Sequence, residues 1–207
     1  MVDSDFSAFY NCSFLGHQDT LYAHALRHLY HGCRIEGTVD FIFGNAAAVF
    51  EECEIIFRPG LLLSGSTTSM ATAQGRTDPG ETTGLVFHHC TLDGTPEFRQ
   101  QWAAGRNHAY LGRPWKLFSR TVFLECSLPD FLEPQGWLPW RGDFALSTLF
   151  YGEYLNSGPG ARPASVRVPW SQQLSYETAS LFSVDPFIQG DRWLPDPSSS
   201  HYIPSSP

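Results

Sequence analysis

Five cysteines lie in the same short sequence phrase, and this repeat constrains the fold more than any other feature of the chain. Each phrase has an aromatic or aliphatic residue, two mostly polar residues, the cysteine, one polar residue and an apolar residue. The phrases are FYNCSF at Cys12, LYHGCRI at Cys33, FEECEI at Cys53, FHHCTL at Cys90 and FLECSL at Cys126. The intervals between these cysteines are 21, 20, 37 and 36 residues.

A period near 20 residues, built from short alternating segments, is typical of one coil of a parallel β solenoid. The longer intervals then contain a coil with an extended loop. Cysteine is a small apolar filler, so it is expected to occupy equivalent interior positions on successive coils. Leucine-rich repeats have similar periods, but their Leu and Asn spacing is missing. An ordinary β sandwich with five buried cysteines stays open as the alternative.

Composition supports an all-β class and excludes several functions. Apolar residues make up 42% of the chain and charged residues 16%, with 18 Gly and 15 Pro, which describes a turn-rich globular protein. The formal net charge is −8, so we expect no nucleic-acid partner. No apolar run is long enough to cross a bilayer, so we expect no membrane association either.

One domain is expected over residues 1–194, with a Pro/Ser-rich, disordered tail over 195–207. The stretches RPGLLLSGSTTS after Cys53 and GTPEFRQQWAAGRNHA after Cys90 are expected to be loops between coils. The stretch SQQLSYETASLFSVDPFI breaks the alternating pattern. We expect it to form a short capping helix that ends before Pro186.

An aspartate within an apolar segment is the first candidate for chemistry. In GTVDFIFGN, Asp40 lies among apolar residues, where an ionised carboxylate is costly unless a cation or several donors meet it. Asp19 lies 21 residues earlier, about one coil, so the two carboxylates should lie on adjacent strands some 5 Å apart. Paired carboxylates in unlike environments can divide the roles of acid and nucleophile.

A cation for this carboxylate is available in the phrase LGRPWK. Arg113 can bind Asp40 through two hydrogen bonds, and Trp115 offers a flat apolar surface that can stack on a sugar ring. Two plainer interpretations remain. Asp19 can simply begin a turn, and an Asp40–Arg113 pair can serve stability alone.

Several phrases, in order and in spacing, resemble the pectin methylesterases (pectinesterases), especially the plant-type enzymes. They are GHQDTLYAH, GTVDFIFGNAA, TAQGRTDP, YLGRPWK and PQGWLPW, and the resemblance runs from about Asp3 to Trp193. It implies a right-handed parallel β-helix that removes methyl esters from homogalacturonan and releases methanol. It also implies that no metal or organic cofactor is needed.

The resemblance assigns catalytic roles by position. Asp40 matches the nucleophile of the family, Asp19 its general acid and base, Gln18 a donor to the oxyanion, and Arg113 the arginine that holds the nucleophile. The family carries a second oxyanion glutamine about one coil earlier, a position before the first residue of this chain. We therefore expect a domain truncated at its N-terminus, with weakened or lost activity.

The resemblance also implies a substrate groove and a cellular setting. Five residues are expected to line the groove: Trp115, Tyr22, Val39, Phe43 and, with the weakest match, Trp137. The expected substrate is methyl-esterified homogalacturonan, in the extracellular plant cell wall. A proteinaceous pectinesterase inhibitor is a candidate partner.

Two other functions stay open at the level of sequence. A non-catalytic pectin-binding protein would keep the aromatic residues while losing turnover. A β-helix glycosidase or lyase could also use two carboxylates, although the phrases above match the esterase pattern better. The histidines at 24, 28 and 31 do not predict a metal site, because a strand does not hold the i, i+4 geometry of a helix.

Overall fold

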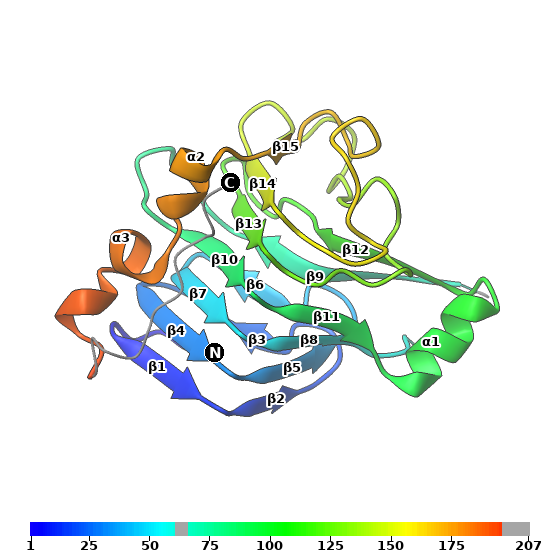
Figure 1. Cartoon of the computed structure of the whole chain (residues 1–207), viewed down its shortest axis with the longest axis horizontal. Helices are drawn as coiled ribbons and strands as arrows, with labels where there is room; N and C mark the ends of the chain where they lie inside the picture. Colours follow the sequence, from blue (N-terminus) through cyan, green and yellow to red (C-terminus); the bar gives the residue numbers. More distant parts are fainter. Residues whose placement is uncertain (61–65, 196–207) are drawn as a thin grey trace.

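The computed structural model describes residues 1–60 and 66–195, and this part of the chain forms a parallel β-helix (Figure 1). Three sheets wind around one interior, and the strand pairs of the described part are parallel. The largest sheet contains β1 (Ser7–Tyr10), β4 (Arg27–His31), β7 (Ala47–Glu51), β10 (Gly84–His88), β13 (Arg120–Leu124), β14 (Phe150–Tyr154) and β15 (Gln172–Gln173), in that order.

Two four-stranded sheets complete each coil. One contains β2 (Ser13–Leu15), β5 (Arg34–Gly37), β8 (Glu54–Phe57) and β11 (Thr91–Gly94). The other, which we call the groove sheet, contains β3 (Leu21–Tyr22), β6 (Ile42–Gly44), β9 (Thr67–Gln74) and β12 (Asn107–Gly112). The predicted solenoid is therefore confirmed.

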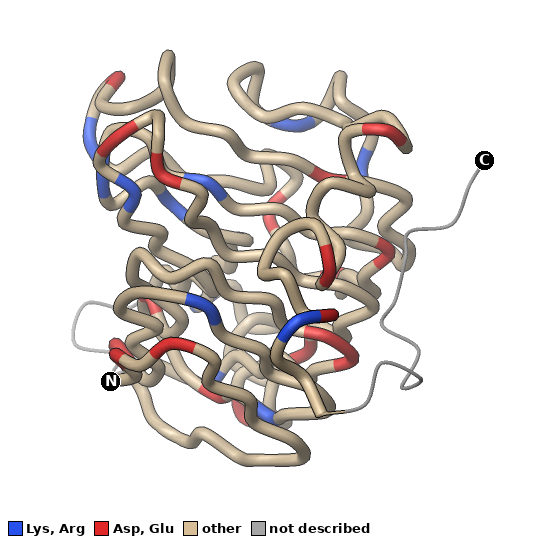
Figure 2. Tube along the Cα trace, turned by 90° about the vertical axis from the view of Figure 1, so that its left-hand side faces the viewer, with Lys and Arg blue, Asp and Glu red and all other residues tan. Residues whose placement is uncertain are grey.

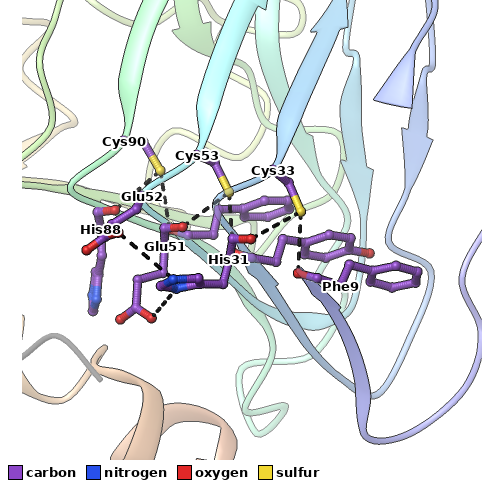
Figure 3. Close-up of polar contacts among 10 residues, drawn as sticks. Phe9, His31, Cys33, Glu51, Glu52, Cys53, His88 and Cys90 are labelled. Atoms are coloured by element: carbon purple, nitrogen blue, oxygen red, sulfur yellow. Dashed lines mark hydrogen bonds and ion pairs between the residues drawn. The ribbon is translucent and has the colours of Figure 1, made fainter. Parts of the chain in front are cut away.

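The repeated phrase forms two ladders in the interior. The aromatic residue of each phrase stacks on that of the next coil, with ring centroids 5.0, 4.6, 4.7 and 4.4 Å apart from Phe9 to Phe123. Three residues later, the thiols of the last four phrases each donate to the backbone oxygen of the aromatic residue one coil earlier, as Cys33 does to Phe9 at 3.4 Å (Figure 3). All five cysteines are free thiols, so none of them forms a disulfide in this structure.

The residue before each cysteine adopts a left-handed backbone, which turns the chain from one sheet to the next. The φ angles are 51° at Asn11, 61° at Gly32, 52° at Glu52, 47° at His89 and 51° at Glu125. Gly adopts this conformation freely, and Asn, Asp and His adopt it more often than other residues do. Glutamate at two of these positions, Glu52 and Glu125, shows that the coil imposes the turn.

The C-terminal segment packs on the side of the solenoid rather than across its end. Helices α2 (Tyr176–Ser180) and α3 (Val184–Ile188) and the 3₁₀ turn η1 (Gly190–Arg192) lie beside the largest sheet (Figure 1). They cover outward-facing residues that include Val49, Val86 and Val122. The expected short helix before Pro186 is present as α2, but it covers the side of the solenoid rather than its end, and a second helix, α3, follows it. Pro186 lies in the first turn of α3, where its missing N–H costs little.

The stretch expected as a loop after Cys90 contains helix α1 (Pro96–Ala103), which projects from the opposite side of the solenoid (Figure 1). The Thr95 side chain accepts a hydrogen bond from the Phe98 amide, and Pro96 occupies the first helical position. The expected loop after Cys53 falls partly on residues outside the described part. The strand β9 begins within it.

Charged residues are spread along the described chain, with both signs interspersed (Figure 2). The chain has 21 acidic and 13 basic residues. Among the described residues, none of the helices has the length and apolar character needed to cross a membrane. Of the predicted tail, residues 196–207 lie outside the described part.

Candidate active site

Asp19 and Asp40 occupy equivalent places on neighbouring coils. Each lies in the turn that precedes a strand of the groove sheet, and the strands that follow pair Leu21 with Ile42 in register. Both aspartates have a left-handed backbone, with φ of 56° and 51°, and the Asp19 amide donates to the Val39 carbonyl at 3.1 Å. The predicted alignment of the two residues is present.

Arg113 holds Asp40 through two hydrogen bonds. Its Nε lies 2.9 Å from Oδ1 and its Nη2 lies 2.7 Å from Oδ2, the bidentate arrangement that a guanidinium offers a carboxylate. The Asp40 residue is only 6% exposed, so this pair is largely shielded from water. The backbone of Arg113 is fixed in turn, because its amide donates to the Thr72 carbonyl at 3.0 Å.

Gly112 permits this close approach of the arginine loop to β9. A Cβ atom at Gly112 would lie 1.9 Å from the Thr72 Oγ1 atom and 2.8 Å from the Thr72 carbonyl oxygen. Any other residue would push the strand away. The glycine of the LGRPWK phrase therefore helps to place Arg113 against Asp40.

Burial and charge act in opposite directions on Asp40. Burial raises the pKa of this carboxyl above its ordinary value, the hydrogen bonds and charge of Arg113 lower it, and the nearby Asp19 carboxylate raises it further. The net direction is upward. As the sequence predicted, Arg113 favours the ionised form of Asp40. Its effect on the pKa, however, only partly offsets the rise that burial causes.

A cavity of about 350 Å³ opens directly over this pair. Its wall is made by Gln18, Asp19, Asp40, Phe43, Ala73, Arg113, Trp115 and Trp140. Gln18 and Asp19 are exposed, whereas Asp40 lies at the bottom and is buried. The cavity thus brings together a buried carboxylate, a second carboxylate, an amide and two indole rings. Groups of these kinds can carry out acyl transfer to a carboxylate nucleophile.

Aromatic rings form one side of the cavity. Tyr22 stacks on Phe43 with centroids 4.4 Å apart, and Trp115 meets Phe43 edge-on at 6.0 Å. Phe43 and Trp115 line the cavity itself. Tyr22 and the half-buried Val39 are not part of the cavity wall. They can make the predicted contact only with a ligand that extends beyond the cavity.

The structure corrects the placement of Trp137. This residue is 1% exposed and packs in the interior, with its ring centroid 4.3 Å from that of Tyr151, so it does not reach the groove. Trp140, three residues later, lines the cavity and lies over the Arg113 guanidinium at 4.3 Å. Sequence reasoning missed Trp140, although the second Trp of PQGWLPW was available as a signal.

Comparison with protein families gives a match over nearly the whole chain. The model of the pectinesterase family matches residues 1–191. A "Probable pectinesterase/pectinesterase inhibitor 64" of Arabidopsis thaliana is 52% identical over 195 residues, covering 92% of this chain and 32% of the relative. A "Pectinesterase/pectinesterase inhibitor PPE8B" of Prunus persica is 47% identical and is covered over 37%. The chain thus spans about a third of these relatives.

Solved structures confirm the predicted fold class, a right-handed parallel β-helix. A pectin methylesterase from carrot superposes with a TM-score of 0.89 at 42% identity, covering 97% of this chain and 62% of that one. A pectin methylesterase from Aspergillus niger gives a TM-score of 0.75 at 30% identity, covering 94% and 58%.

Proposed function

Because the chain belongs to the pectinesterase family, we propose that its cavity hydrolyses methyl esters of homogalacturonan and releases methanol. The observation that carries the proposal is the buried, bidentate Asp40–Arg113 pair at the bottom of a cavity that also presents Asp19 and Gln18. Arg113 aims one carboxylate, and a second carboxylate remains accessible for proton transfer.

In the first step, an Asp40 oxygen attacks the ester carbonyl carbon and the carbonyl oxygen gains the negative charge. The Gln18 side-chain amide donates a hydrogen bond to this oxyanion. Asp19 gives its proton to the methoxy oxygen as the C–O bond breaks. Methanol leaves, and an anhydride joins Asp40 to the galacturonate carbonyl.

In the second step, water hydrolyses the anhydride. Asp19, now a carboxylate, accepts one proton from the water as it attacks, and the oxygen of the water joins the galacturonate carbonyl. Asp40 leaves as a carboxylate and returns to its pair with Arg113. The products are a free uronic acid and an enzyme in its starting protonation state, so no external oxidant or cofactor enters the balance.

The walls of the cavity suit a saccharide ligand. The exposed faces of Trp115 and Trp140 offer apolar surfaces for sugar rings, and the Lys116 Nζ atom lies 5.0 Å from the Trp115 centroid, where it can meet a uronate carboxylate. Family membership supports an extracellular site of action in the plant cell wall. The relatives named pectinesterase/pectinesterase inhibitor make an inhibitor domain a candidate partner.

The test is methanol release from highly methyl-esterified homogalacturonan by the purified chain. We expect release by the parent and its loss in Asp40→Asn, which keeps the shape of the side chain but removes the nucleophile. Asp93→Asn is the matched control, because Asp93 is a partly exposed partner of Arg99 that does not line the cavity. Saccharide binding without any methanol release would favour a pectin-binding protein instead.

A further inference from the structure

The phrase TAQGRTDP contributes no group to the proposed chemistry, yet its glutamine is among the most buried polar residues of the described part of the chain. Gln74 is 0% exposed. Its Oε1 accepts from the amides of Arg76 at 2.8 Å and Arg120 at 2.9 Å, and its Nε2 donates to the Asn45 Oδ1 at 3.2 Å. This single side chain therefore connects three separate segments.

The backbone of Gln74 holds the loop that carries Arg113 and Trp115 and that leads directly into Arg120. The Gln74 carbonyl accepts from the Trp115 amide at 3.2 Å and from the Ser119 hydroxyl. Ser119 is fully buried and also accepts from the Lys116 amide at 3.2 Å. The beginning and the end of the Trp115 turn are thus anchored on one carbonyl group.

Gly75 makes room for the indole ring of Trp115. A Cβ atom on Gly75 would lie 2.8 Å from Cε3 and 3.1 Å from Cζ3 of that ring. The φ of Gly75 lies outside the left-handed region, so its backbone would accept alanine without strain. The indole ring supplies the two closest contacts of the added methyl group, with the Gly44 carbonyl oxygen next at 3.4 Å.

The same dipeptide also sets the position of the opposite aromatic wall. The Gly75 amide donates to the Gly44 carbonyl at 2.8 Å, and Gly44 directly follows Phe43 in β6. Gln74 binds the next residue, Asn45. The two motifs that supply Phe43 and Trp115 to the cavity therefore share one support.

We propose that Gln74 and Gly75 form a seat for Trp115, in which both act as positioning residues that hold the indole as a wall of the saccharide groove. The identity of the groove's ligand rests on the proposed function. The seat itself rests on packing and hydrogen bonding. Its consequence is that ligand affinity depends on a residue that never touches the ligand.

A double-mutant cycle tests the seat without reference to activity. Urea midpoints are measured for the parent, Gly75→Ala, Trp115→Ala and the double variant. We expect Gly75→Ala to lower the urea midpoint of the parent. In the Trp115→Ala background the clash is gone and alanine stiffens the unfolded chain, so we expect the same substitution to leave the midpoint unchanged or to raise it. An equal loss in both backgrounds would overturn the proposal.

Binding of a methyl-esterified oligogalacturonide, measured by calorimetry, gives the second readout. We expect Gly75→Ala to raise the Kd roughly three- to tenfold, the loss of one aromatic contact, with no further increase when it is added to Trp115→Ala. An unchanged Kd in Gly75→Ala would also overturn the seat. No binding by the parent would contradict the proposed function. The double-mutant cycle of urea midpoints would still show whether the seat exists.

Two controls separate positioning from general destabilisation. Gly80→Ala adds the same methyl group in the same loop, where the contact found within 4 Å is the Asp78 side chain at 3.1 Å. Val86→Ala removes buried contacts beneath the C-terminal helices, away from the groove. We expect Val86→Ala to lower the urea midpoint, Gly80→Ala to change it little, and both to bind the oligogalacturonide as the parent does.

Discussion

Arg113 reaches Asp40 across 73 residues of sequence and meets both of its carboxylate oxygens, at 2.9 and 2.7 Å. The pair joins the turn before β6 to the loop after β12, so it forms only when the coils are stacked. Burial raises the pKa of Asp40, and Arg113 opposes that rise. The ionisation of the proposed nucleophile therefore depends on this one contact.

Replacement of Arg113 should move the acid limb of the pH–rate profile. Asp40 reacts as a carboxylate, so kcat/KM falls as the pH drops through its raised pKa. Arg113→Met removes the contribution that lowers this pKa, so the limb should shift to higher pH, and the rate at a fixed acidic pH should fall. The profile of kcat/KM for methanol release checks this. A limb that stays in place would show that Asp40 does not govern it.

Gln18→Leu should lower kcat while leaving saccharide binding nearly unchanged. Gln18 lines the cavity and is the proposed donor to the oxyanion, a charge that exists only during the reaction. Removal of one such donor costs about 100- to 1,000-fold in rate. Single-turnover methanol release and calorimetric Kd values separate the two effects. A large rise in Kd with unchanged kcat would assign Gln18 to ground-state binding instead.

The two tryptophans of PQGWLPW should respond differently to substitution. Trp140→Ala removes a cavity wall and should raise the Kd for an oligogalacturonide roughly three- to tenfold, with little loss of stability. Trp137→Ala empties a buried site and should cost roughly 3–5 kcal/mol of unfolding free energy. Urea unfolding and calorimetry on both variants give the comparison. Equal effects on Kd would contradict the distinction between them.

His88 should make the protein less stable in mild acid. Burial lowers its pKa to about 3, against an ordinary value of 6.5, so the unfolded chain gains a proton first as the pH falls. The contribution of neutral His88 is fully present above pH 6.5 and is lost progressively towards pH 3. Across this window the loss is about 4–5 kcal/mol.

The His88 contribution is measured as a difference. Urea unfolding is followed at pH 7 and pH 4.5 for the parent, for His88→Gln and for His17→Gln, in which an exposed histidine is changed. The pH dependence should weaken in His88→Gln and persist in His17→Gln. An identical dependence in all three proteins would exclude His88 as its source.

The sequence predicted the solenoid because one phrase marks the same place on every coil. The aromatic residue and the cysteine face the interior, so their spacing is visible without a structure. The turn between them is not visible in this way. Glu52 and Glu125 adopt a left-handed backbone that glutamate disfavours, because the stacked neighbours impose it.

Long-range packing decided the features that the sequence did not reveal. Trp137 and Trp140 have the same chemistry, and only the path of the chain directs one inward and the other over Arg113. The sequence pattern of the C-terminal segment indicates helix. It does not show where the segment packs, because the apolar face that the helices cover belongs to strands far away in sequence. The pairing of Asp40 with Arg113, by contrast, was predicted from the cost of burying a charge.

The central claim, that Asp40 is a nucleophile, is tested most directly by trapping its acyl intermediate with hydroxylamine during turnover of methyl-esterified homogalacturonan. Hydroxylamine can attack either carbonyl of the anhydride, which gives a hydroxamate on Asp40 or on the galacturonate. We predict that one of these two hydroxamates forms during turnover, found by mass spectrometry of the peptides and the saccharide, and that both are absent in Asp40→Asn. Methanol release by the parent with neither hydroxamate formed would contradict the claim, because it would mean that water attacks the ester directly.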